Sequence, residues 1–134
     1  MNPVYFGTHF ERREAWENSP AEFAIITAYA TTGEEWASIE NEAADKKLES
    51  ELRKRGCWLQ RLTGYSPVTG HAEPGWAVAM PFEVACDLGL RFQQDAIYYV
   101  TGDTLYVTAC DERRAPVEVG VFSSRVHVVG FTKR

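Results

Sequence analysis

Four polar side chains fall where the hydrophobic pattern predicts packed helices and strands. Asn41 lies seven residues before Leu48, on the inward stripe of a predicted helix, and Gln94 sits between a predicted helix and a predicted strand. Tyr29 ends one apolar run, and Glu73 precedes another. We predict that these side chains build a polar pocket. Its candidate catalytic base is Glu73, and its substrate-binding residues are Asn41, Gln94 and Tyr29.

The same amides also have a structural interpretation. The segment Phe92-Gln93-Gln94-Asp95-Ala96-Ile97 places three polar residues between two apolar elements, with little room for a loop. Burying an unpaired amide costs about 1–3 kcal/mol, so these groups must find hydrogen-bond partners nearby. Gln94 would then tie the second helix to the following strand, and Asn41 would cap a chain end. We favour this interpretation for Gln94.

The sequence lacks the motifs of metal, nucleophile and phosphate-binding sites. His9, His71 and His127 are far apart, and no His-x-His, His-Glu-x-x-His or Cys-x-x-Cys spacing occurs, so we expect no metal site. No Gly-x-Ser-x-Gly motif occurs. Cys86 is the thiol nearest a helix start, but an inert, partly buried cysteine is the better interpretation. Gly-rich phosphate loops are missing from the sequence, so we predict no cofactor.

Composition indicates a small acidic globular protein. The 134 residues are 45% hydrophobic and carry a formal net charge of −5. This charge disfavours non-specific binding to nucleic acid and to anionic membranes. No apolar run approaches the ~20 residues needed to span a bilayer, and no signal-peptide pattern opens the sequence. Three cysteines without paired spacing suit reduced thiols, so we predict a cytoplasmic protein.

Hydrophobic periodicity predicts two helices separated by pairs of strands. The first helix starts near residues 36–38 and ends at Gly56, and the second runs from Pro81 to Phe92. Gly89 in the second helix indicates a close approach to the sheet. The predicted strands are residues 23–29, 57–62, 76–80, 97–100, 105–107, 117–121 and 126–129, with a loop over 66–75 and a hairpin at 101–104.

This order of elements predicts an α+β fold in two layers. The sheet is expected to be mostly antiparallel with two helices on one face, a ferredoxin-like split βαβ sandwich with extra C-terminal strands. We predict a single domain over residues 1–134. It would comprise an N-terminal arm (1–20), a core (22–110) and a β-rich tail (111–134).

Four short motifs resemble a known family. They occur in the order Ile26-Thr27-Ala28-Tyr29, Glu40-Asn41, Glu73-Pro74-Gly75-Trp76 and Phe92-Gln93-Gln94-Asp95-Ala96-Ile97. They are similar to an uncharacterised bacterial family, a domain of unknown function with Ile-Thr-Ala-Trp-Asn-Pro, Glu-Asn, Trp-Glu and Phe-Gly-Gln-Asn-Ala-Ile motifs, over about residues 22–110. Here Tyr29-Ala30-Thr31 replaces Trp-Asn-Pro, and Gln93 replaces the Gly. The resemblance implies a bacterial origin and a compact α/β domain, and it supplies no activity.

Three functions fit the sequence, and whether the protein is an enzyme stays open. The first is an accessory protein that binds a protein partner or a second copy of itself, since the chain is acidic, lacks catalytic motifs and has an aromatic-rich N-terminus. The second is a hydrolase of a phosphorylated or nucleotide-like molecule, with Glu73 as base. The third is an accessory factor in RNA metabolism, which only the fold type and the arginine clusters favour.

Overall fold

The computed structural model describes residues 1–30 and 37–129. Within these ranges the chain forms eight strands, two α-helices and two short 3-10 helices. In chain order they are η1 (Pro3–Gly7), β1 (His9–Arg12), β2 (Glu22–Ile26), α1 (Ser38–Lys54), β3 (Leu59–Tyr65), β4 (Ala72–Val78), α2 (Phe82–Arg91), β5 (Ala96–Thr101), β6 (Thr104–Ala109), β7 (Val117–Val121), η2 (Phe122–Ser124) and β8 (Val126–Val128). Among the described residues, neither α-helix has the length and apolar character that crossing a bilayer requires.

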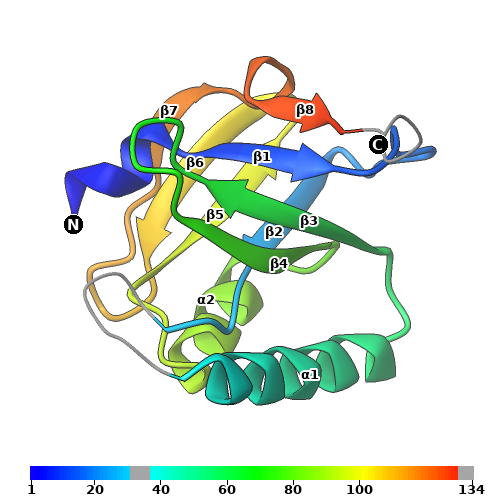
Figure 1. Cartoon of the computed structure of the whole chain (residues 1–134). Helices are drawn as coiled ribbons and strands as arrows, with labels where there is room; N and C mark the ends of the chain where they lie inside the picture. The colour runs from blue at the N-terminus through cyan, green and yellow to red at the C-terminus, as the bar shows by residue number, and fades with distance from the viewer. Residues whose placement is uncertain (31–36, 130–134) are drawn as a thin grey trace.

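The eight strands form one sheet in the order β7-β6-β5-β2-β4-β3-β1-β8. Neighbouring strands are antiparallel, except that β1 and β8 run parallel. The prediction of a two-layer ferredoxin-like sandwich is therefore wrong, because the sheet is mixed and curls into a half-barrel (Figure 1). The sheet is larger than a ferredoxin-like sheet, because β6 and β7 add to it beyond β5 and β1 and β8 add to it beyond β3.

The curl brings the two edges of the sheet close together. β7 and β8 stand at opposite ends of the strand order, yet only η2 and Arg125 separate them in the chain. The Arg125 guanidinium spans this seam, donating to the carbonyl of Val119 on β7 at 2.6 Å and to that of Phe6 at 2.7 Å. Across the concave face, the rings of Phe10 on β1 and Tyr98 on β5 lie 5.3 Å apart. The concave face is therefore an interior rather than an open surface.

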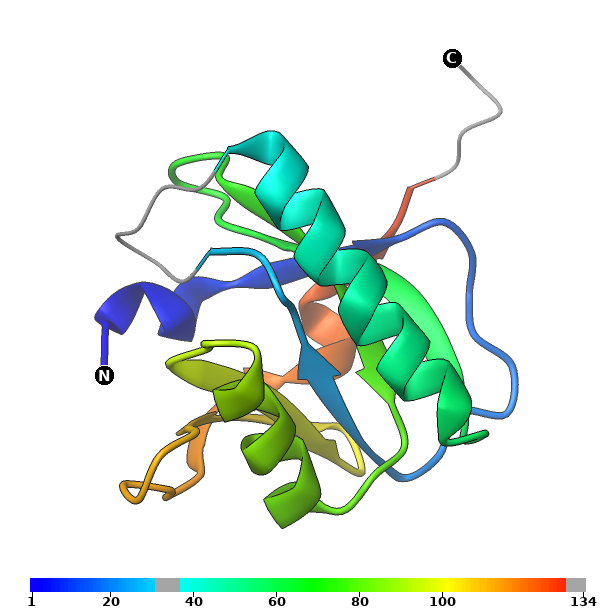
Figure 2. The same ribbon diagram turned by 90° about the horizontal axis from the view of Figure 1, so that it is seen from below.

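Both α-helices cover the convex face of the sheet (Figure 2). Leu48 and Leu52 of α1 are fully buried there against outward-facing strand residues. On α2, a Cβ added at Gly89 would lie 2.7 Å from Cys110 Sγ and 2.9 Å from Ile97 Cγ2. This confirms the predicted close approach of the second helix to the sheet.

The concave face encloses a second core, which contains aromatic as well as aliphatic side chains. Its buried members are Phe10, Phe23, Ile25, Leu62, Ala77, Val100, Leu105 and Phe122. The ring of Phe23 packs edge-on against Phe122 at 5.5 Å and against Trp16 at 5.8 Å. These contacts fill one end of the half-barrel, and the inward-facing positions at the other end of the strands surround a cavity.

Several local features follow from the sequence, and others do not. Gly56 has a φ of +68° just after α1, and Gly102 has a φ of +64° in the hairpin between β5 and β6, as their positions predicted. By contrast, β2 ends at Ile26, before the end of the predicted strand. β4 begins at Ala72, inside the predicted loop over 66–75.

Candidate functional site

A cavity of about 280 Å³ lies at the open end of the concave face. Its walls come from inward-facing positions on β1 to β5, together with η1 and the loop between β3 and β4. Successive residues of a strand point to opposite faces, so the set of side chains that forms the inner core continues into this space. Phe10, Ile25 and Leu62 belong to both the core and the cavity wall. The wall is thus mostly apolar where it meets the core.

Two glycines at inward-facing positions make the hollow. Gly64 pairs with Phe10 on one side and with Glu73 on the other, so no side chain covers the space between them. A Cβ added at Gly64 would meet only ordinary contacts at 3.5 Å. A Cβ at Gly75 would instead lie 2.9 Å from the Ile26 carbonyl oxygen, so the backbones approach closely there. Gly64 is therefore the position from which the cavity can be filled.

Glu73, the predicted base, lines this cavity from β4. Its side chain is 18% exposed, and its Oε2 lies 2.8 Å from Nε2 of His71, which is 68% exposed. Over residues 1–30 and 37–129, no three His, Cys, Asp or Glu side chains gather into a possible metal site. The carboxylate thus faces an apolar space with one polar partner at the rim.

Gln94 also lines the cavity, and its amide fastens the chain around it. Nε2 donates to the carbonyl of Tyr29 at 2.8 Å and to that of Phe92 at 3.1 Å. The side chain therefore ties the end of α2 to the segment that follows β2. Gln93 before it has a φ of +61°, so it adopts the left-handed conformation that Gly favours. A role for Gln94 in binding a substrate stays a prediction.

Asn41 and Tyr29 stand outside the cavity wall as the structure describes it. Asn41 Oδ1 accepts a hydrogen bond from the backbone N–H of Ala30 at 2.9 Å, so it faces the chain just after β2. The backbone N–H of Tyr29 donates to Thr27 Oγ1 at 3.2 Å, and that hydroxyl donates to the Pro74 carbonyl at 2.8 Å. Burial and then the carboxylate of nearby Asp45 raise the pKa of the Tyr29 hydroxyl. Of the four predicted residues, two line the cavity and two hold the chain behind it.

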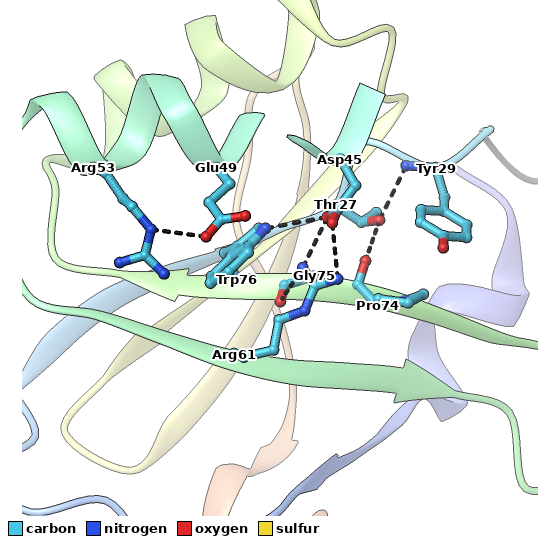
Figure 3. Close-up of polar contacts among 9 residues, drawn as sticks. All are labelled: Thr27, Tyr29, Asp45, Glu49, Arg53, Arg61, Pro74, Gly75 and Trp76. Atoms are coloured by element: carbon cyan, nitrogen blue, oxygen red, sulfur yellow. Dashed lines mark hydrogen bonds and ion pairs between the residues drawn. The ribbon is translucent and has the colours of Figure 1, made fainter. Parts of the chain in front are cut away.

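Sequence reasoning missed a polar cluster beneath α1 (Figure 3). Arg61 donates from Nη1 and Nη2 to the two carboxylate oxygens of Asp45, both at 2.8 Å. The indole N–H of Trp76 donates to the same carboxylate at 3.1 Å, and the Arg61 guanidinium lies 4.3 Å from the centre of a Trp76 ring. The cluster joins α1 to β3 and β4. The sequence does contain an indication of this cluster, because Asp45 is a charged residue four positions after Asn41, on the inward stripe of the helix.

Tyr98 fixes the cover of the cavity. Its hydroxyl lies 2.9 Å from the Tyr5 carbonyl and 2.7 Å from Thr8 Oγ1. Since a carbonyl only accepts, the Tyr98 hydroxyl donates to Tyr5 and accepts from Thr8. Burial raises the pKa of Tyr98 well above its usual value, and the hydrogen bond from Thr8 lowers it in part. The phenol thereby pins η1 over the cavity, a role that its place in the β5 sequence did not reveal.

In a comparison with family models, residues 26–97 match a protein of unknown function, DUF3293. The chain belongs to the DUF3293 family. The DUF3293 match is shorter than the span of about 22–110 that the motifs indicated. No curated protein and no solved structure matches the chain.

The DUF3293 segment contains only part of the cavity wall. Thr27, Glu73 and Gln94 lie inside residues 26–97, as do the Asp45 cluster and both helices. The cover lies outside it, because η1 precedes the match and Tyr98 follows it. The polar side of the cavity thus belongs to the family segment, and its apolar cover is supplied by the flanking chain.

Proposed function

We propose that the protein is an accessory binding protein that holds a small, mainly apolar molecule in the cavity on its concave face. The observation that carries this proposal is the cavity itself: about 280 Å³, mostly apolar, with polar groups along one side. Small-molecule sites in proteins have this composition, and their volumes begin at about 300 Å³. A ligand smaller than a typical drug molecule fits the space.

The arrangement of the wall supports binding more than hydrolysis of a phosphorylated substrate. Where the structure describes the wall, it contains no Lys or Arg side chain. A phosphoryl group would therefore meet the carboxylate of Glu73 without a cation to balance it, which is unfavourable in a partly desolvated site. A nucleotide-like substrate or an RNA backbone faces the same objection. We therefore do not adopt the hydrolase or the RNA interpretation.

The test is to fill the cavity from Gly64. Gly64→Val adds a side chain at a position with ordinary contacts and suits a strand, so the fold should be kept. Small aromatic molecules would be titrated into 15N-labelled protein, with the backbone amide of Gly75 as the reporter. We expect saturable shifts in the wild type and in Thr63→Val, which adds a similar group on the opposite face of the same strand. The shifts should be lost in Gly64→Val.

Two results would overturn the proposal. One is the absence of saturable shifts at Gly75 with every molecule of the panel. The other is equal binding by the wild type and a folded Gly64→Val variant, which would place the ligand elsewhere.

A second candidate is association of two copies through β7. This strand ends the sheet order, and its Val117 and Val121 side chains are exposed. An edge strand with exposed apolar side chains favours pairing with another strand. Sedimentation should then show a concentration-dependent dimer that Val121→Lys dissociates. A wild-type monomer at all concentrations would exclude this mode of assembly.

A further inference from the structure

We infer that the ligand of the concave cavity is an organic cation, an amine with a small apolar body, and that Glu73 is its counter-ion. This inference rests on the proposed function and adds the chemical class of the ligand. It follows from the charge of the wall, the position of the carboxylate and the aromatic rings around it.

The charge of the wall is one-sided. In the part of the chain that the structure describes, Glu73 is the one Asp, Glu, Lys or Arg residue that lines the cavity. The Arg125 guanidinium is not a lining group, since its hydrogen bonds go to the backbone carbonyls of Phe6, Thr8 and Val119. His71 contacts the carboxylate at 2.8 Å from the rim. A cationic ligand is favoured in such a space and an anionic one is disfavoured.

The position of Glu73 leaves its carboxylate accessible to a ligand. Its neighbour across the β3–β4 pair is Gly64, which has no side chain to cover it. A carboxylate offers about four lone-pair sites, and the contact with His71 occupies one of them. An ammonium group brings up to three N–H donors, and hydrogen bonds between ionised partners are the strong ones. The head of an amine therefore matches what Glu73 presents.

Aromatic rings complete the site. Tyr5, Phe10, Tyr65 and Tyr98 line the same cavity. An aromatic ring attracts a cation to its face and also packs against an apolar body. The wall thus provides a surface for both parts of an amine, whereas a carboxylate ligand would be repelled by Glu73 and would gain no cation–π attraction from the rings.

The experiment compares three probes of one shape: benzylamine, benzyl alcohol and benzoate. Titration of each into the wild type should give the order benzylamine, then benzyl alcohol, with benzoate weakest. A charge-assisted hydrogen bond predicts a preference for the amine over the alcohol of about tenfold or more. Glu73→Gln keeps the size of the side chain and should remove that preference, because benzylamine should lose about tenfold or more in affinity. Glu118→Gln, on the exposed part of β7, is the control for loss of charge.

A second variant keeps the inference testable if Glu73→Gln fails to fold. His71→Ala removes the competing donor from the rim, so benzylamine should bind more tightly to it than to the wild type. Weaker amine binding in this variant would contradict the inference. Equal binding of amine and alcohol by the wild type, or tightest binding of benzoate, would overturn the choice of a cation while leaving cavity binding in place. Failure of all three probes to bind would remove both the inference and the proposed function.

Discussion

Replacing Asp45 tests whether the polar cluster beneath α1 holds this helix on the sheet. The carboxylate accepts two hydrogen bonds from Arg61 at 2.8 Å and one from the Trp76 indole at 3.1 Å. The Asp45 side chain is 11% exposed and the Arg61 side chain 41% exposed, so water screens only part of the pair. The interaction therefore lies between a surface ion pair and a fully buried one.

The contacts give the expected magnitudes. In Asp45→Asn the amide oxygen can still accept a hydrogen bond, but the amide NH₂ then faces an N–H donor of the Arg61 guanidinium. One charge-assisted hydrogen bond is lost, so the free energy of unfolding should fall by about 2 kcal/mol. Asp45→Ala also leaves the buried N–H of Trp76 without an acceptor, which costs a further 1–2 kcal/mol or so. The total for Asp45→Ala should be about 3–4 kcal/mol.

Urea unfolding followed by tryptophan fluorescence measures these changes. The matched control on the same helix is Glu49→Gln, which breaks an ion pair of 2.7 Å with the mostly exposed Arg53. That pair should contribute no more than about 0.5 kcal/mol. If Asp45→Asn lowered the free energy of unfolding no more than Glu49→Gln does, the cluster would not fasten α1 to the sheet.

Three further changes have expected outcomes. Gly89→Ala gains about 1 kcal/mol of helix propensity. The new Cβ would lie 2.7 Å from Cys110 Sγ, however, and overpacking of this kind costs about 1–3 kcal/mol. The cost should outweigh the gain, so the urea midpoint of unfolding should fall. Gln93→Gly should stabilise the protein by about 1 kcal/mol, because it relieves a φ of +61°; an unchanged midpoint would count against strain there. Burial, then nearby positive groups, lower the pKa of His9, so the unfolded chain binds a proton more readily, and stability should decline as the pH falls below about 6.5. Unfolding midpoints at successive pH values should show this decline, and His9→Gln should reduce it.

The helices and central strands were predictable because their patterns are local. α1 ends just before Gly56, and the hairpin turns at Gly102, where the sequence indicates a left-handed residue. β1 was not predictable in the same way. It has four residues, of which only Phe10 is buried, so no alternation stands out. The curl of the sheet depends on contacts such as that of Arg125 with Val119 and Phe6, and no short segment of sequence encodes them.

The candidate site was only partly predictable, for a related reason. Asn41, Glu73 and Gln94 could be selected from the sequence because they are polar residues within an apolar pattern. A buried polar group needs a hydrogen-bond partner nearby, so such residues have a structural or a functional role. The hydrogen bonds show that the amides of Asn41 and Gln94 serve the backbone of the segment after β2. Whether a side chain serves the fold or a ligand depends on what lies across the sheet from it, and that requires the strand register.

The register separates Glu73 from the other predicted residues. Both amides contact backbone groups within the protein, whereas Glu73 has Gly64 as its cross-strand neighbour and, among residues 1–30 and 37–129, a rim histidine as its one polar partner. A glycine is conspicuous in a strand because it weakens it and often marks close approach of a ligand or another backbone. A Cβ at Gly64 would meet no close contact, so the fold itself does not demand glycine there. The empty position beside a partly buried carboxylate is therefore better explained by the ligand that we propose for the cavity than by how the sheet packs.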